Sequence, residues 1–152
     1  MSQEDTNPLE QHPGYAVKRL QLAVRIAVDA AVASTTLSMA QFAVLRNLAD
    51  SGPMPAAELA RRCFTTRQSM QDVLKYLRTR KLVESVLSTS SGRTQKLALT
   101  AQGKKLLDEA TIKVRAVDDR MLYGLTPSQR SQFVSWLNLC ANNLKQPDVG
   151  GA

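Results

Sequence analysis

The sequence lacks the features by which membrane-spanning and secreted proteins are usually known. No run approaches the roughly 18 consecutive apolar residues that a membrane span requires. The first residues, MSQEDTNPLEQHPG, are acidic and polar, without the basic start and apolar segment of a secretion signal. The sequence therefore predicts a cytoplasmic protein that has no membrane partner.

Residues that usually carry catalysis or hold metals are also scarce. The chain has two cysteines, Cys63 and Cys140, which lie far apart, and one histidine, His12, in a polar stretch. None of them has partners at metal-ligand spacing, and two distant cysteines provide no disulfide framework. No glycine-rich phosphate loop and no pairing of a nucleophile with a base is evident. These absences favour a protein that is not an enzyme and carries no metal or cofactor.

Basic residues, in contrast, are concentrated in the middle of the chain. The 45 residues from Arg61 to Lys105 contain eleven basic and two acidic residues, a net charge of +9. The rest of the chain contains nine basic and eleven acidic residues, a net charge of −2. A basic segment between nearly neutral arms is the electrostatic pattern of a polyanion-binding region. A solvated basic face without a partner is the alternative, and charge alone does not decide between them.

The N-terminal part of the sequence predicts two helices. Residues 15–33 are rich in alanine and valine, and their apolar residues form two stripes, one of which includes Leu20 and Val24. A helix that is apolar on more than one face needs more than one neighbour, and a second subunit could be one of them. Ser38 and Gln41 then form the capping-box pattern that opens a second helix.

Two short helices joined by a tight turn follow. Pro55 suits the first turn of a helix that runs to Cys63, and either Thr65 or Thr66 can cap a second helix over about residues 67–80. In that second helix the apolar residues share one face, and the polar and basic residues point away from it. Two helices of this kind make a helix-turn-helix, whose second helix reads the major groove of DNA.

The pattern then changes to a hairpin followed by two more helices. Residues 83–88 and 94–100 contain β-branched and alternating residues on either side of a turn-forming stretch that ends at Arg93. Thr100 can cap a long helix whose apolar residues alternate steps of three and four, a seam suited to packing along another helix. Residues 126–129 form a second capping box, with proline at the first helical position of a last helix.

The predicted fold class is therefore mostly α-helical, with a two-stranded wing. One domain is expected over residues 15–145, with disordered tails over residues 1–14 and 146–152. Within it we expect a winged helix-turn-helix over residues 37–100 and dimerisation helices over residues 15–36 and 101–145.

Over residues 15–144 the sequence resembles the MarR-type (multiple antibiotic resistance regulator) transcription factors. Residues 59–83 match the helix-turn-helix of the family without gaps. Leu-Thr-Ala-Gln-Gly at 99–103 is similar to the family's Leu-Thr-Pro-Glu-Gly, where the wing enters the long helix. The resemblance implies a homodimer with recognition helices in successive major grooves and wing tips in the flanking minor grooves. It implies a DNA-binding transcriptional regulator, expected to be a repressor, with a near-palindromic double-stranded operator.

The candidate DNA-contacting residues lie in the helix-turn-helix and the wing. Gln68 and Gln71 can read adenine by paired hydrogen bonds, and Arg93 is the candidate for the minor groove. Asp72 departs from the family, in which a basic residue is common at its position. The complete set of expected contacts is Arg61, Thr66, Arg67, Gln68, Ser69, Gln71, Asp72, Lys75, Arg78, Arg93 and Lys96.

The resemblance also implies a dimer interface and an effector pocket. The residues expected at the interface are Leu20, Val24, Val117, Met121, Phe133, Trp136 and Leu137. The residues expected to line the pocket, between the dimerisation helices and the winged domain, are Tyr15, Arg19, Met39, Phe42 and Arg46. Their mixture of apolar surface and cationic donors suits an aromatic carboxylate or a phenol as the effector.

Two other functions stay open at this point. One is a regulator switched by oxidation of Cys63 or Cys140, although both cysteines fall at apolar positions typical of buried small hydrophobic residues. The other is a winged-helix module that binds protein rather than DNA. The basic segment favours DNA binding, and the placement of the cysteines favours a ligand over a thiol switch.

Overall fold

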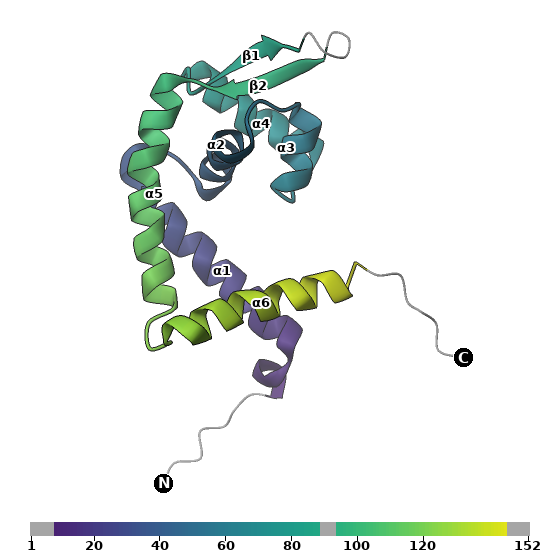
Figure 1. Ribbon diagram of the computed structural model, residues 1–152, viewed down its shortest axis with the longest axis vertical. Helices are drawn as coiled ribbons and strands as arrows, with labels where there is room; N and C mark the ends of the chain where they lie inside the picture. The colour runs from purple at the N-terminus through teal and green to yellow at the C-terminus, as the bar shows by residue number, and fades with distance from the viewer. Residues whose placement is uncertain (1–7, 89–93, 146–152) are drawn as a thin grey trace, which may run out of the picture. The chain divides into compact units, whose positions relative to one another are not determined.

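A computed structural model describes residues 8–88 and 94–145 (Figure 1). Contacts within the chain divide it into two compact units, Met1–Val117 and Asp118–Ala152, so the boundaries expected for a single domain stay a prediction. Residues 1–7 and 146–152, assigned to disordered tails, lie outside the described residues, as do the wing residues 89–93.

Helical structure begins earlier than the sequence predicts. A 3-10 helix, η1, spans Pro8–Gln11, and α1 spans Pro13–Val32, so residues 8–14 are not the disordered tail that we expected. Proline suits the first position of α1, because the N–H that it lacks would have no partner there. Arg19 of α1 pairs with Glu10 of η1 at 3.7 Å, which joins the two elements.

The second helix, α2, spans Met39–Ser51, and its predicted capping box is present. Gln41 N donates to Ser38 Oγ at 3.2 Å, and Ser38 N donates to Gln41 Oε1 at 2.9 Å. The carboxylate of Asp29, on α1, adds a third contact by accepting from Met39 N at 2.7 Å. Asp29 thus satisfies an N–H that has no partner within its own helix and attaches the start of α2 to α1.

The predicted helix-turn-helix consists of α3, Ala56–Arg62, and α4, Arg67–Thr79. Pro55 is the residue before α3 rather than its first helical residue. Of the two threonines that could cap α4, Thr66 does so, by accepting from Ser69 N at 3.1 Å. Figure 1 shows the two helices joined by a short turn, with α2 beside them.

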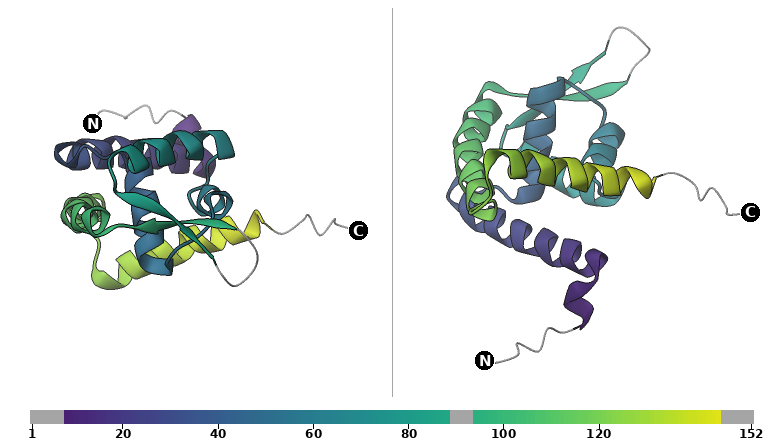
Figure 2. Two further views of the ribbon diagram at one scale, coloured as in Figure 1. Left: turned by 90° about the horizontal axis from the view of Figure 1, so that it is seen from above. Right: turned by 60° about the horizontal axis from the view of Figure 1, so that its bottom comes forward.

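The wing is an antiparallel pair of strands, β1 (Val83–Leu87) and β2 (Gln95–Leu99), with Val83 opposite Leu99. Met54, in the segment before α3, pairs with the other edge of β2. Met54 N donates to Leu97 O at 3.1 Å, and Leu97 N donates to Met54 O at 2.9 Å. This bridge attaches the wing to the helix-turn-helix, from which the hairpin extends in Figure 2.

The core of the first unit is formed mainly by leucine, valine and methionine side chains from α1 to α5 and both strands. Its largest fully buried side chains are Leu45, Leu59, Met70, Leu74, Leu77, Leu82, Leu97 and Leu107. Burial of a leucine stabilises a fold by about 1.5–3 kcal/mol, so these contacts dominate the stability of this unit.

The long helix α5, Ala101–Met121, starts where Leu-Thr-Ala-Gln-Gly is found, and the structure gives a reason for that motif. Thr100 Oγ1 accepts from Gly103 N at 3.0 Å and donates to the Lys81 carbonyl at 2.7 Å. A Cβ atom on Gly103 would lie only 2.1 Å from Leu82 O. The threonine therefore fixes the helix start against the end of the recognition-helix segment, and only glycine permits that approach.

The apolar seam of α5 packs inside its own chain. Leu107, Ala110 and Val117 are buried, and Val114 packs against the same core. Val117 was expected at the dimer interface, but its side chain is 6% exposed because it lies in the core of its own unit. The three-and-four spacing predicted helix packing correctly and did not distinguish an internal neighbour from a second subunit.

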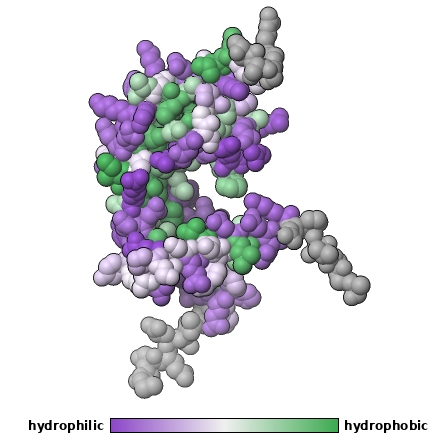
Figure 3. All heavy atoms as spheres, in the orientation of Figure 1, coloured by the Kyte–Doolittle hydropathy of each residue, from purple (hydrophilic) through white to green (hydrophobic). Residues whose placement is uncertain are grey.

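The second unit contains α6, Pro127–Asn143, whose predicted capping box between Thr126 and Gln129 is present. Arg130 pairs with Asp119 at 3.1 Å within this unit. No residue of α6 is buried, and Cys140 is exposed rather than buried as its apolar neighbours suggested. Hydrophobic residues consequently reach the surface among hydrophilic ones (Figure 3).

Two further features follow from the described helices and side chains. No single described helix is long and apolar enough to cross a membrane. The segments Pro13–Thr35 and Met39–Ser51 reach that length and composition only when they are taken together, and the chain bends by 77° between them. Residues 8–88 and 94–145 contain no group of three metal-ligating side chains.

Candidate nucleic-acid interface

The recognition helix α4 has one buried face and one exposed face. Met70, Leu74 and Leu77 are buried against the core. The exposed face carries most of the residues that the sequence assigns to DNA: Thr66, Arg67, Gln68, Ser69, Gln71, Asp72 and Lys75. The periodicity of the sequence therefore predicts correctly which side of this helix is available to a partner.

Five of the seven side chains on the exposed face have no intramolecular partner among the described residues. Within residues 8–88 and 94–145, Arg67, Gln68, Gln71, Asp72 and Lys75 make no side-chain hydrogen bond or ion pair. Donors and acceptors that are exposed and unpaired can form hydrogen bonds with base edges and phosphates without first breaking other contacts. Thr66 and Ser69 differ from them, because they form the cap of the helix.

Three other candidates are in different situations. Arg78 is half-buried, and its Nε is buried without a hydrogen-bond partner among the described residues. Lys96 is half-buried on β2, opposite Val86. Arg93, the expected minor-groove probe, lies outside the described residues. Arg78, on α4, and Lys96, on the wing, stay candidates for phosphate contacts.

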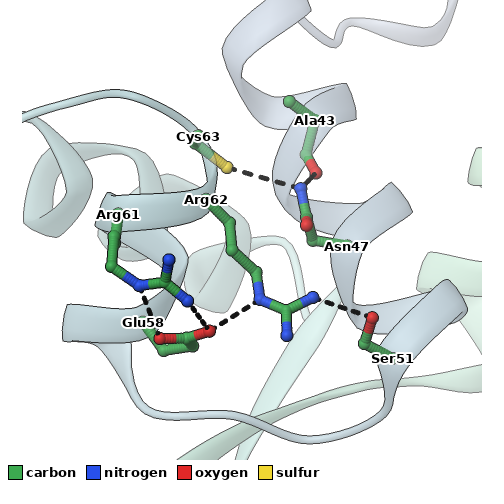
Figure 4. A network of polar contacts seen from close by, with 7 residues as sticks. All are labelled: Ala43, Asn47, Ser51, Glu58, Arg61, Arg62 and Cys63. Carbon is green, nitrogen blue, oxygen red and sulfur yellow. Dashed lines mark hydrogen bonds and ion pairs between the residues drawn. The ribbon is translucent and has the colours of Figure 1, made fainter. Parts of the chain in front are cut away.

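Arg61, on α3, is bound by a neighbour that the sequence analysis did not single out (Figure 4). Glu58 accepts two hydrogen bonds from Arg61, at 2.6 and 3.0 Å, and one from Arg62, at 2.8 Å. These hydrogen bonds lower the pKa of Glu58 to about 2, so its carboxylate is ionised at neutral pH. The spacing of three and four residues along a helix is the signal by which this cluster could have been predicted.

The C-terminal end of α4 is attached to the 3-10 helix η2, Ala33–Thr35, and to Thr36 directly after it. The sequence analysis did not predict these contacts. Tyr76 Oη donates to Thr36 O at 2.8 Å, and Arg80 Nη1 donates to the same carbonyl at 3.2 Å. Arg80 also reaches Thr35 O at 3.5 Å and lies over the Tyr76 ring, 5.5 Å from its centre. We call Thr35, Thr36, Tyr76 and Arg80 the carbonyl clamp. A cation at the carbonyl end of a helical segment is electrostatically favourable.

The N-terminal end of α4 borders a cavity of about 440 Å³. Met39 and Ala43 of α2, together with Met70 and Val73 of α4, supply apolar walls. Arg25 of α1 also lines it and has no ion-pair partner among the described residues. The cavity therefore combines apolar walls with one available cation.

Of the five residues expected to line an effector pocket, only Met39 lines this cavity. Arg19 and Arg46 form ion pairs with Glu10 and Asp50, and Phe42 packs against the core. Tyr15 lies at the start of α1 and is 38% exposed. The apolar walls and the cation of the cavity thus come mainly from residues other than those that we selected.

Cys63 also borders the cavity, and its surroundings are those of a structural thiol. Its Sγ accepts from Asn47 Nδ2 at 3.7 Å, and burial raises the pKa of the thiol. A raised pKa lowers the fraction of thiolate, the form that reacts with oxidants.

The elements and the exposed recognition face define a winged helix-turn-helix protein. The sequence profile of the MarR family matches residues 35–94. The chain is 38% identical over 120 residues to the HTH-type transcriptional repressor Rv2887 of Mycobacterium tuberculosis. This alignment covers 79% of the present chain and 86% of Rv2887. The chain belongs to the MarR family.

Two solved structures support the same conclusion. The transcriptional repressor CouR, bound to a 23-mer DNA duplex, is 30% identical with a TM-score of 0.82, covering 92% of this chain and 99% of that one. The Mycobacterium tuberculosis protein Rv2887 in complex with salicylic acid is 36% identical with a TM-score of 0.70, covering 85% and 96% of the two chains. The predicted family and fold class are confirmed.

Proposed function

We propose that this protein is a transcriptional repressor, rather than an enzyme, that binds a specific double-stranded DNA sequence and releases it when a small aromatic acid binds. The observation that carries the proposal is the exposed, unpaired polar face of α4 on a winged helix-turn-helix. The basic segment around α4 supplies attraction for phosphates. The likeness to a repressor bound to a DNA duplex supports the same reading.

The repressor acts as a homodimer in this proposal. The exposed apolar side chains of α6, Val134, Trp136, Leu137 and Leu139, are 38–57% exposed within one chain and need a cover. Phe133 and Met121 contribute further apolar surface from the same unit, and Leu20 does so from α1. Val24, also expected at the interface, is half-buried and packs against the core of its own unit. Sedimentation at micromolar concentration tests this point, and a folded, soluble monomer would contradict it.

A dimer places two recognition helices on one face of DNA, so the operator should be a near-palindrome with half-sites about 34–36 Å apart. Selection of duplexes from a random pool identifies this operator.

The operator then allows a test of base recognition by α4. We expect Gln71→Ala to lose about 1–3 kcal/mol of discrimination at one base pair of each half-site. Gln102→Ala, an equivalent change on the exposed start of α5, is the matched control and should leave every preference intact. Failure to enrich any sequence would contradict the proposed function.

Asp72 gives a separate test of how the recognition face works. Because its carboxylate is exposed and unpaired, we expect it to repel phosphates. Asp72→Ala should then strengthen binding to all duplexes about equally. A loss of preference confined to one base pair would instead show that Asp72 accepts a hydrogen bond from a base.

The cavity beside the N-terminal half of α4 is the effector site in this proposal. Its apolar walls suit an aromatic ring, and Arg25 suits a carboxylate. Asp29 also borders the cavity, but its carboxylate is engaged by Met39 N. Because Met70 and Val73 belong to α4, a ligand that fills the cavity changes the packing contacts on the buried side of the recognition helix directly. The relative solved with salicylic acid supports this ligand class.

Salicylate and a panel of aromatic acids and phenols test the effector site. We expect thermal stabilisation of the protein and release of the operator, both abolished by Ala43→Leu, which narrows the cavity. Ala49→Leu, on the exposed side of the same helix, is the control and should respond as the wild type does. If no compound in a broad panel changes either quantity, the protein is a DNA binder without this regulation.

A thiol switch is the second candidate for regulation. The raised pKa of Cys63 disfavours it, whereas the exposure of Cys140 leaves that thiol accessible. Oxidation should release DNA in this alternative, and a variant without either cysteine should not respond. We expect instead that operator binding by the wild-type protein is the same before and after treatment with peroxide.

A further inference from the structure

Glu58 is the centre of a compact charged cluster on α3 (Figure 4). Both of its carboxylate oxygens accept from Arg61, and Oε1 also accepts from Arg62. Arg62 in turn donates from Nη1 to Ser51 Oγ, at the end of α2, at 2.9 Å. The side chain of Arg61 is 71% exposed and that of Glu58 is 31% exposed, so Arg61 is the outer member of the cluster.

The cluster limits what its arginines can offer to DNA. An arginine binds phosphate most strongly through two parallel N–H groups, and Glu58 occupies Nε and Nη2 of Arg61 in this way. A phosphate must displace the carboxylate to use this edge of the guanidinium, or bind the outer edge, where Nη1 and Nη2 each have a further N–H, while the carboxylate stays beside it. The three side chains together carry +1 rather than the +2 of two free arginines.

We propose that Glu58 competes with DNA phosphates for Arg61 and thereby lowers the affinity of the protein for any duplex. This inference rests on the proposed DNA-binding function and adds to it an internal restraint. Glu58 does not itself bind DNA in this proposal and acts chiefly through Arg61. Such a restraint suits a repressor that must leave DNA when a modest free energy of ligand binding opposes it.

The test is a double-mutant cycle with Glu58→Gln and Arg61→Met, measured on the selected operator and on an unrelated duplex across salt concentrations. One additional phosphate contact steepens the fall of log affinity with log salt by about 0.9. We therefore expect the advantage of Glu58→Gln over the wild type to grow by about eightfold when salt is lowered tenfold. In the Arg61→Met background, the same substitution should have a much smaller effect on affinity and slope, because it then breaks only the pair of Glu58 with Arg62.

Three results would overturn the proposal. An equal gain from Glu58→Gln with and without Arg61 would mean that Glu58 only repels DNA through its charge. Weaker binding by Glu58→Gln would mean that Glu58 holds Arg61 in its productive position. An equal gain from Asp50→Asn, which breaks the exposed Arg46–Asp50 pair on α2, would mean that any lost negative charge has this effect.

Separate controls distinguish an effect on folding from an effect on DNA binding. Thermal melting shows whether each variant is folded. If the Glu58→Gln variant does not fold, Glu58→Ala replaces it, because alanine also removes the carboxylate and favours a helix. A wild-type protein that binds no selected duplex refutes the proposed function. A wild-type protein that binds tightly, with additive effects in the cycle, refutes only the role of Glu58.

Discussion

The two ends of the recognition helix are held in different ways. At its C-terminal end, Tyr76 and Arg80 both donate to the carbonyl of Thr36, which lies 40 and 44 residues earlier in the chain. At its N-terminal end, the cap is local, from Thr66 to Ser69, and a cavity separates this end from α1. One end is thus attached to the rest of the unit by polar contacts, and the other end is supported by the walls of a cavity.

This difference suggests how a ligand could act on DNA binding. Of α4, only the N-terminal half lines the cavity, so a ligand bound there as proposed would contact that half, whose opposite, exposed face carries Gln68 and Gln71. The carbonyl clamp holds the other end, so the expected movement is a tilt of the helix rather than a displacement of the whole. A ligand shifts this equilibrium only by its difference in affinity for the two positions.

The largest effect should come from breaking the clamp with Arg80→Ala. Arg80 donates charge-assisted hydrogen bonds to two carbonyls, and such bonds contribute about 1.5–3 kcal/mol each in favourable settings. Because the guanidinium is partly exposed, we expect a loss of about 2 kcal/mol in the free energy of unfolding, measured in urea. Arg46→Ala, which removes an arginine from an exposed pair on α2, should cost less than about 1 kcal/mol. Equal losses in the two variants would show that the clamp does not hold α4.

Removal of the local cap by Thr66→Ala should have a smaller effect, at the other end. The side chain of Thr66 satisfies one N–H at the start of α4, and loss of such a cap costs about 1 kcal/mol. Hydrogen exchange should show faster opening of the first turn of α4 and unchanged protection of its last turn. Uniform acceleration along the helix would mean that its two ends are not held independently.

Local features of this fold were predictable from the sequence, because they depend on neighbours in the chain. Capping boxes at Ser38 and Thr126, and the exposed face of α4, follow from spacings of three and four residues. The ion pairs of Glu58 and Arg46 have the same spacing and could have been found in the same way. The four-residue spacing of Arg46 and Asp50 thus predicts an ion pair on α2 for this arginine, which was expected in a pocket.

Contacts between distant segments were not predictable in this way. The carbonyl clamp and the cavity both depend on how α1 and α2 pack against α4, which no local pattern encodes. Val117 shows the same limit, since an apolar seam looks alike whether it faces its own core or a partner. The Leu-Thr-Ala-Gln-Gly motif was recognised by resemblance, and its cause, the approach of Gly103 to Leu82 O, is visible only in three dimensions.

Loss of a single neutral hydrogen bond at the clamp should have a still smaller effect. Tyr76→Phe removes the hydroxyl that donates to Thr36 O and keeps the ring that lies beside Arg80. Because the group is exposed, we expect a loss of about 0.5–1 kcal/mol in the free energy of unfolding. Tyr123→Phe, on a fully accessible side chain in the other unit, is the control and should change nothing. If Tyr76→Phe is also neutral, Arg80 alone maintains the clamp.

The smallest effect is expected from the turns that follow α3 and α4. Both helices end in the same motif. The second residue beyond each helix has φ above +50°, namely Phe64 (52°) and Lys81 (57°), in the left-handed region that favours glycine.

Lys81→Gly removes the strain of a side chain in that region, about 1–2 kcal/mol, and adds flexibility to the unfolded chain, about 0.4–1 kcal/mol. We expect a net gain of about 0.5 kcal/mol in the free energy of unfolding. Phe64→Gly is the matched variant. Its side chain is 92% exposed, so it too should lose little packing and gain a similar amount. A gain at Lys81 with a loss at Phe64 would show that Phe64 supports the cavity wall, and the free end of α4 would then depend on a side chain that looks unpartnered.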